Sequence, residues 1–208
     1  MDAANNAPTV DYYGTTVYNS LNTTAGVTTS AYSLQVWFNS TAPYTAKPLA
    51  YVFTRANSPS ESGRRDAVYV GGTYSGIQPR KLALVAGNNS SGIPAIFGTR
   101  ELQENTWYHM VFVRDESEPA KAKVYLNGRL EIESTQSWWG GGTGDYLYAA
   151  NRPDYNIGFG ISGHYDEVAV WDRALSAGET WGLYTAALDG PYYARTVMND
   201  MPEAYWRL

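Results

Sequence analysis

The 208-residue sequence predicts an all-β fold, a two-sheet antiparallel sandwich or jelly roll. First, strand-like runs recur at short, even intervals, with Gly, Ser, Asn and Pro clusters between them. Second, only one segment, near Ala177–Tyr184, has a convincing helical pattern. Third, the chain is 44% hydrophobic and only 17% charged, which is typical of a folded domain with a sizeable core.

Two runs show how the strands should be placed in the sandwich. The run YSLQVWFNS alternates between apolar and polar residues, which predicts a strand with one core face. The residues expected on that face are Tyr32, Leu34, Val36 and Phe38. The run Trp107–Asp115 is apolar on both faces, so we expect a central strand between two layers.

Turn and cap residues delimit the later elements. Asn127-Gly128 supplies the two positive-φ positions of a tight hairpin turn. Ser176 and Glu179 have the spacing of a capping box, so a helix should begin at Ala177. The run HYDEVAVWDR predicts a regular strand whose two faces alternate. One face would hold Tyr165, Glu167, Ala169 and Trp171, and the other Asp166, Val168 and Val170.

Composition excludes several classes of protein. The chain has no cysteine, so it has neither a disulfide scaffold nor a thiolate zinc site. Its net charge of −5 and its short basic clusters argue against binding to nucleic acid. No apolar run reaches the roughly 18 residues of a membrane helix. The first residues, MDAANNAPTV, do not resemble a secretory signal.

Three stretches together resemble the laminin-G-like, concanavalin A-like jelly-roll domains. They are NTWYHMVFVRD followed by AKVYLNGRLEIES, the closing run GHYDEVAVWDRALSAGETWGLY, and PEAYWRL, which is similar to the opening strand of units in tandem arrays. The resemblance implies a concanavalin A-like sandwich. It also gives a structural signature role to Trp107, Asn127, Gly128, Asp166, Glu167, Trp171, Ser176 and Glu179.

The resemblance also suggests how the chain is divided. We expect an N-terminal arm with edge strands in residues 1–30, a laminin-G-like jelly roll in residues 31–188, and a C-terminal extension in residues 189–208. The extension ends in a strand-like run. That strand could join the chain's own sheet, pair with a neighbouring subunit, or open a next repeat.

Catalysis is not expected. Retaining glucanases of this fold group resemble one another in a strand with alternating acids, because retention needs two carboxyls about 5 Å apart. The sequence has no such run, and its paired acids lie beside a hairpin or in a polar loop. These acids are Glu116, Glu118, Glu131 and Glu133. His109 and His164 lack the converging partners of a metal site or triad, so we interpret both as structural.

The stretch Ser137–Arg152 is the predicted ligand site. Exposed aromatics with polar groups at their edge suit a sugar, and glycines let the backbone approach a ligand closely. The candidate residues are Trp138, Trp139, Asp145, Tyr146, Tyr148, Asn151 and Arg152. Packing of the tryptophans under a loop is the structural alternative. The only cofactor considered is calcium, which many relatives hold at the rim of the sandwich; its candidate ligands are Asp145, Asn151 and Asp154.

We therefore expect a non-catalytic lectin or adhesion domain, which binds carbohydrate or another surface partner through loops at the sandwich rim. The alternative is a structural virion subunit, a bacteriophage capsid or tail protein held by its termini to other virion proteins or to copies of itself. A glycoside hydrolase is a third reading. Either of the first two places the chain outside the cell, on a cell surface or on a virion, without membrane insertion.

Overall fold

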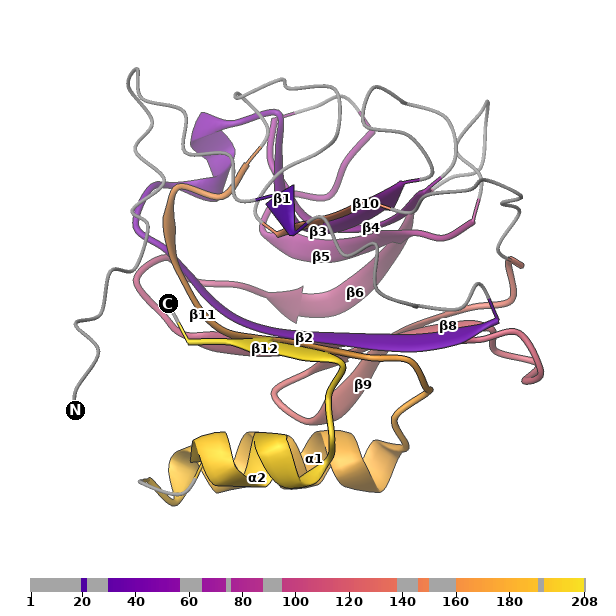
Figure 1. Ribbon diagram of the computed structural model, residues 1–208. Coiled ribbons are helices and arrows are strands. Elements are labelled where there is room, and N and C mark those ends of the chain that lie inside the picture. The colour runs from indigo at the N-terminus through magenta and orange to yellow at the C-terminus, as the bar shows by residue number, and fades with distance from the viewer. Residues whose placement is uncertain are drawn as a thin grey trace.

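The computed structural model describes residues 20–21, 30–56, 65–73, 76–87, 95–137, 146–149, 160–190 and 193–207. Within them, two antiparallel six-stranded sheets stack face to face (Figure 1). The first sheet has the order β1 (Ser20–Leu21), β10 (Tyr146–Ala149), β3 (Leu49–Ala56), β4 (Arg65–Gly71), β5 (Lys81–Val85) and β6 (Ile96–Glu101). The second has the order β12 (Ala204–Trp206), β11 (Gly163–Trp171), β2 (Ala31–Ser40), β7 (Tyr108–Asp115), β8 (Ala122–Leu126) and β9 (Arg129–Ser134). The predicted all-β, concanavalin A-like sandwich is confirmed.

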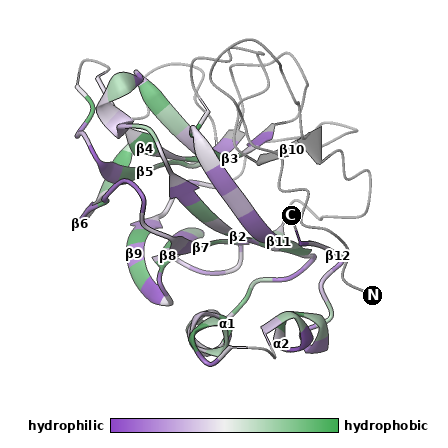
Figure 2. Cartoon of the chain, turned by 90° about the vertical axis from the view of Figure 1, so that its left-hand side faces the viewer, coloured by the Kyte–Doolittle hydropathy of each residue, from purple (hydrophilic) through white to green (hydrophobic). Residues whose placement is uncertain are grey.

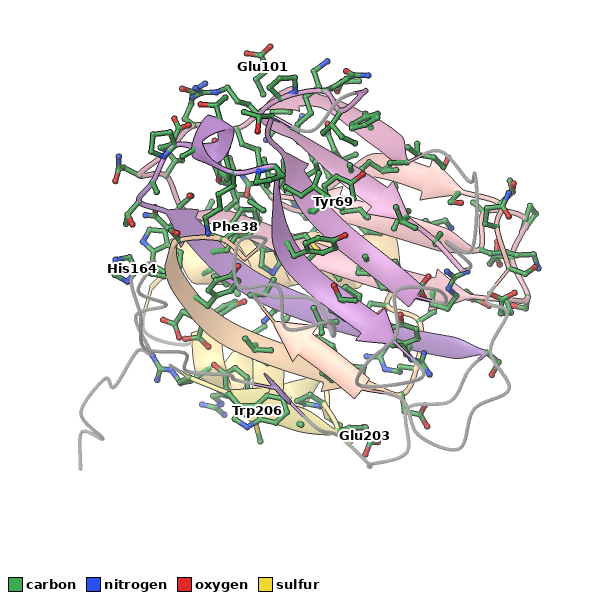
Figure 3. All side chains as sticks on the ribbon, turned by 90° about the horizontal axis from the view of Figure 1, so that it is seen from above. Phe38, Tyr69, Glu101, His164, Glu203 and Trp206 are labelled. Carbon is green, nitrogen blue, oxygen red and sulfur yellow. The ribbon has the colours of Figure 1, made fainter. Side chains whose placement is uncertain are left out.

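The main core lies between the two sheets. It contains all four residues that the alternation of β2 predicted, which are Tyr32, Leu34, Val36 and Phe38, each at most 1% exposed. A short 3₁₀ helix, η1 (Tyr44–Ala46), closes one end, where the Tyr44 ring enters the core. On the far face of the first sheet, Tyr69 lies in a smaller buried cluster (Figure 3).

Two helices cover the outer face of the second sheet (Figures 1 and 2). They are α1 (Ala177–Leu188) and α2 (Tyr193–Asn199). Beneath them, Val111 and Val113 of β7 join an outer cluster, whereas Met110 and Phe112 of the same strand enter the main core. β7 is therefore buried on both faces, as its sequence predicted.

The prediction of a single helix ending near Tyr184 was wrong. The capping box begins α1 as expected, since Ser176 and Glu179 each satisfy the other's backbone N–H group. However, α1 continues to Leu188, and α2 follows as a second helix. α2 has only seven residues, so its stability depends on the burial of Tyr193 and Val197, one turn apart, against the sheet.

The predicted alternation of β11 was also wrong. The register against β2 shifts between Asp166 and Ala169, which leaves one extra residue in β11. Glu167 takes a positive φ of 54° at this bulge. As a result, Tyr165 points into the main core together with Val168, instead of sharing the face of Ala169.

The Asn127-Gly128 hairpin is confirmed, with φ values of 51° and 72°. The Asn127 Oδ1 atom accepts a hydrogen bond from the His109 backbone N–H at 2.9 Å. A Cβ atom on residue 128 would lie only 2.8 Å from the Trp181 ring of α1. Glycine is therefore required both by the turn and by the close packing of α1 on it.

A buried polar network joins the two sheets. Asp66 of β4 and Arg114 of β7 form an ion pair with both side chains fully buried. Asp66 also accepts hydrogen bonds from the Tyr32 hydroxyl at 2.7 Å and from the Gly87 N–H at 2.9 Å. Arg114 extends the network to Glu116 at 2.9 Å. The Asp66 carboxylate is therefore held by groups from both sheets.

The C-terminal strand β12 pairs with β11 of the same chain, with Tyr205 opposite Ala169. Trp206 packs against the main core and Tyr205 against the outer cluster, while Glu203 precedes β12 at the sheet edge (Figure 3). In the structure, the C-terminal strand thus joins the chain's own sheet. The domain limits at residues 30 and 188 stay a prediction.

Candidate functional site

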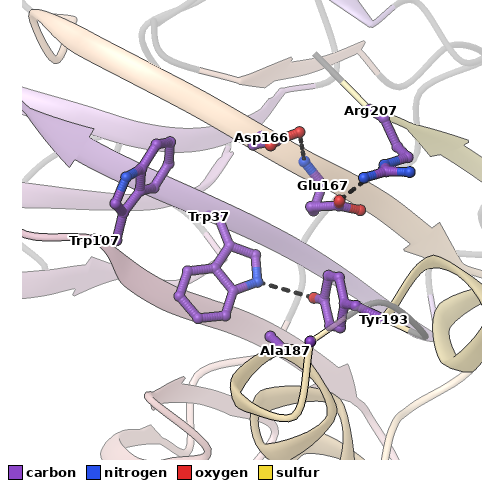
Figure 4. Close-up of a pocket in the computed structure, with 8 residues that line it drawn as sticks. Trp37, Trp107, Asp166, Glu167, Ala187, Tyr193 and Arg207 are labelled. Carbon is purple, nitrogen blue, oxygen red and sulfur yellow. Dashed lines mark hydrogen bonds and ion pairs between the residues drawn. The ribbon is translucent and has the colours of Figure 1, made fainter. Parts of the chain in front are cut away.

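A pocket of about 300 Å³ opens on the outer face of the second sheet, where α1 ends (Figure 4). Segments far apart in the sequence converge on it: β2, the start of β7, the bulge of β11, the α1–α2 junction and the residue after β12. The lining residues are Trp37, Trp107, Asp166, Glu167, Ala187, Gly190, Tyr193 and Arg207.

Aromatic side chains form one part of the pocket. Because Phe38 points into the core, its neighbour Trp37 points to the outer face. The Trp37 Nε1–H group donates a hydrogen bond of 2.9 Å to the Tyr193 hydroxyl, and the two rings meet edge to face at 6.3 Å. His109 packs against Trp37 at 5.0 Å. The Trp37 ring is thus fixed in place, whereas Trp107 is 42% exposed at the mouth.

His109 and His164 differ in their surroundings. His109 is fully buried, and its Nε2 atom lies 3.1 Å from Gln35 Oε1. Burial lowers the pKa of His109 to about 3, so the ring is neutral, in keeping with the structural role predicted for it. His164 lies at the edge of the molecule (Figure 3), where its ring contacts Trp107 at 6.3 Å.

The β11 bulge supplies two adjacent carboxylates. Neighbours in a regular strand point to opposite faces, but here both Asp166 and Glu167 line the pocket. Asp166 Oδ1 accepts a hydrogen bond of 2.8 Å from the Glu167 N–H group, and Gln35 donates one of 3.1 Å to the Glu167 carbonyl. The bulge is therefore held by side chains on both strands.

Glu167 is tied to the C-terminal segment. Its carboxylate pairs with Arg207 Nε at 3.0 Å and accepts a hydrogen bond from the Tyr205 hydroxyl. The pKa of Glu167 is raised to about 7, mainly by burial and also by the neighbouring charge of Asp166, while Arg207 opposes the rise. Glu167 therefore changes charge near neutral pH.

This pKa leads to a prediction for stability. The folded chain binds the Glu167 proton more tightly than the unfolded chain, whose glutamate pKa lies near 4.5. The stabilising contribution of protonated Glu167 should be complete below about pH 4.5 and be lost as the pH rises through about 7. Glu167→Gln should abolish this decline. Urea unfolding of wild type and Glu167→Gln at several pH values between about 4.5 and 7 measures the difference in their free energies of unfolding. The contributions of other titrating groups cancel in this difference.

Arg207→Ala provides the control. Removing the opposing positive charge should raise the pKa of Glu167 further and move the decline to higher pH. The same pH dependence in wild type and Glu167→Gln would contradict the assignment.

Three of the residues assigned to the structural signature lie in β11. Trp171 is buried and its Nε1–H donates to the Asp200 carbonyl at 3.1 Å, while Asp166 and Glu167 form the bulge. Glu131 accepts hydrogen bonds from the backbone N–H groups of Thr99 (2.6 Å) and Arg100 (2.8 Å), which joins the edges β9 and β6. The Glu131 carboxylate is therefore held by the backbone of β6.

The predicted rim site lies mostly outside the described residues. That holds for Trp138, Trp139, Asp145, Asn151, Arg152 and Asp154. Tyr146 and Tyr148 belong to β10, whose backbone pairs with β3 and β1. Among the described residues, no three His, Asp or Glu side chains converge as metal ligands. Calcium binding at Asp145, Asn151 and Asp154 stays a prediction.

Local sequence patterns assigned no site role to Trp37, Tyr193 or Arg207. One signal was present: on β2, Trp37 occupies the face otherwise held by Ser33, Gln35 and Asn39. A large aromatic on a polar face indicates either a covering element or a ligand. Here α2 is the covering element, and the pocket beside Trp37 has space for a ligand.

The order of the strands in the two sheets and the helix pair on one outer face define a jelly-roll sandwich. The chain belongs to the concanavalin A-like lectin/glucanases superfamily, whose sequence profile matches residues 13–180. No curated protein sequence matches the chain. Neither helix in the described ranges has the length and hydropathy needed to span a membrane.

Solved structures share this fold at low sequence identity. A heptameric SAP-like pentraxin from Limulus polyphemus is 18% identical, with a TM-score of 0.58 over 76% of this chain and 71% of the pentraxin. A protein from Bacteroides ovatus described as carbohydrate binding is 18% identical, with a TM-score of 0.56 over 79% of this chain and 43% of that protein. Trypanosoma rangeli sialidase is 13% identical, with a TM-score of 0.58 over 76% of this chain and 23% of the sialidase.

Proposed function

We propose that this chain is a non-catalytic recognition domain that binds carbohydrate in the pocket of Figure 4. The observation that carries the proposal is the convergence of two tryptophans, two carboxylates and a guanidinium on one concave site. In the proposed complex the target lies outside the cell, on a cell surface or in the surrounding matrix.

The chemistry of the lining residues suits a sugar. Sugar rings present apolar C–H faces that pack on Trp107 and Trp37, and hydroxyl groups that hydrogen-bond with Asp166. A volume of about 300 Å³ lies at the lower end of the range for small-molecule sites, as expected for a short glycan end. The superfamily and the carbohydrate-binding description of the Bacteroides ovatus protein support the same ligand class.

Binding without catalysis is supported by the state of the two acids. Glycoside hydrolysis needs two carboxyl groups on either side of the scissile bond. Asp166 and Glu167 are adjacent in sequence, and each already has a structural partner, the Glu167 N–H group and Arg207 respectively. The rim stretch around Trp138 stays a second predicted contact region.

A glycan array with two tryptophan variants tests the proposal. Trp107→Ala should weaken binding roughly 10- to 30-fold, since truncating a tryptophan anchor costs about 2 kcal/mol. Trp181→Ala is the matched control, because Trp181 is 43% exposed against 42% for Trp107 but packs on the hairpin, outside the pocket. Affinities are then measured by titration calorimetry, and melting curves check that both variants are folded.

The outcomes separate the alternatives. Glycan binding that is lost in Trp107→Ala and kept in Trp181→Ala supports the pocket. Binding that is unchanged in Trp107→Ala would move the site elsewhere, and no binding to any glycan would rule out the proposed function.

A further inference from the structure

A buried polar side chain lies beside the mouth of the pocket without a hydrogen-bond partner. Asn39 is on the outer face of β2, because its neighbour Phe38 points into the main core. Asn39 is only 9% exposed, and its Oδ1 atom is closed to solvent and has no hydrogen-bond partner among the described residues. Leaving a buried acceptor unpaired costs free energy, so the free protein carries an unfavourable group at this position.

Two aromatic rings cover the Asn39 amide. β2 lies between β11 and β7, and the residues beside Asn39 are His164, its partner on β11, and Trp107, which directly precedes β7. Neighbouring strands are about 4.8 Å apart, so β11 and β7 are separated by about twice that distance. The ring centroids of His164 and Trp107 are nevertheless only 6.3 Å apart. The two rings therefore lean toward each other across Asn39.

The Trp107 ring is held less firmly than the Trp37 ring, its neighbour in Figure 4. Trp37 is fixed by its hydrogen bond to the Tyr193 hydroxyl. Trp107 is exposed at the mouth, its ring contacts His164, and its indole N–H group has no hydrogen-bond partner in the part of the chain that the structure describes. Turning this ring away from Asn39 thus breaks no hydrogen bond, and it opens the amide to the pocket that Trp107 lines.

We propose that Asn39 is a further binding residue of this pocket: the Trp107 ring turns onto the bound sugar, and a sugar hydroxyl donates a hydrogen bond to Asn39 Oδ1. The acceptor that is unpaired in the free protein is then satisfied in the complex. A site built to hydrogen-bond a hydroxyl group rejects analogues that lack it, so Asn39 selects among glycans. This inference deepens the proposed function and rests on it.

The first test measures the stability of the free protein. Asn39→Leu removes the unpaired acceptor and keeps a similar volume, so the melting temperature should be unchanged or higher. Gln35→Leu is the matched control on the same face of β2, since its amide is hydrogen-bonded at both ends, to the Glu167 carbonyl and to His109. This control should melt about 5 °C lower than wild type. A similar fall in Asn39→Leu would show that the Asn39 amide is structural and would overturn the inference.

The second test measures selectivity by titration calorimetry. The probes are the strongest binder of the glycan array and its analogues in which one hydroxyl of the terminal sugar is replaced by hydrogen. Asn39→Leu should bind the parent glycan about tenfold more weakly than wild type does, the usual effect of one hydrogen bond. One of the analogues should bind about tenfold more weakly than the parent to wild type, but equally well to Asn39→Leu. Asn39→Ala, which leaves more room for the sugar, should give the same result and shows that the leucine side chain does not simply block the pocket.

The outcomes distinguish this inference from the proposed function. Glycan binding that is lost in Trp107→Ala but kept at full affinity in Asn39→Leu and Asn39→Ala would overturn the role of Asn39 and leave the carbohydrate pocket intact. The same conclusion follows if every analogue is discriminated equally by wild type and by the Asn39 variants. If no glycan of the array binds to wild type, the proposed function fails together with the inference.

Discussion

Asp66→Ala is expected to lower the free energy of unfolding by about 3–5 kcal/mol, the usual range for breaking a buried ion pair. The substitution leaves the Arg114 guanidinium buried between the sheets without its fully buried carboxylate partner. It also removes the acceptor of the Tyr32 hydroxyl and of the Gly87 N–H group. Urea unfolding followed by tryptophan fluorescence measures the loss.

Glu116→Ala is the matched control for this network. Glu116 also pairs with Arg114, but its side chain is 22% exposed, so water replaces the lost contact. We expect a loss of about 1 kcal/mol or less, as for a surface ion pair. Equal losses of unfolding free energy in Asp66→Ala and Glu116→Ala would show that the buried Asp66–Arg114 pair stabilises the sandwich no more than the partly exposed Glu116–Arg114 pair does.

Trp171→Ala is expected to destabilise the chain by about 3–5 kcal/mol, through the cavity that it leaves. Trp171 is 1% exposed in the outer cluster, and its indole N–H group ties β11 to the Asp200 carbonyl just after α2. Loss of this anchor should loosen α2 from the sheet. Because α2 carries Tyr193, glycan binding should fall as well. Unfolding curves and titration calorimetry measure the two effects.

Trp171→Phe separates packing from the hydrogen bond. It keeps most of the apolar volume and removes the indole donor, so we expect a loss of about 1–2 kcal/mol with binding retained. Unchanged glycan affinity in folded Trp171→Ala would show that the pocket does not depend on the anchoring of the helix pair.

The strands and the first helix could be predicted because their signals are local. The alternation of Tyr32 to Phe38, the Asn127-Gly128 turn and the Ser176–Glu179 capping box each act within a few residues. The second helix was missed because it is short and follows a Gly-Pro break, although Tyr193 and Val197 have helical spacing. Its stability comes from docking on a distant sheet, which a local pattern does not contain.

The pocket could not be predicted from local patterns. It needs the extra residue at Glu167, because in a regular strand Asp166 and Glu167 would have pointed to opposite sheet faces. A bulge is decided by how β11 and β2 pair across the sheet. Trp37 on β2 and Arg207 after β12 line the same pocket only because β11 pairs with β2 on one side and with β12 on the other.

The position of β2 also governs how the chain folds during synthesis. β2 lies between β7 and β11, and the hydrogen bond from Gln35 to Glu167 joins residues 132 positions apart. Until the ribosome has released β11, one edge of β2 has no partner and the outer cluster has no helices to cover it. Pairings between residues so far apart form slowly, so we expect the free edge of β2 to be open to non-native pairing until β11 has docked on it.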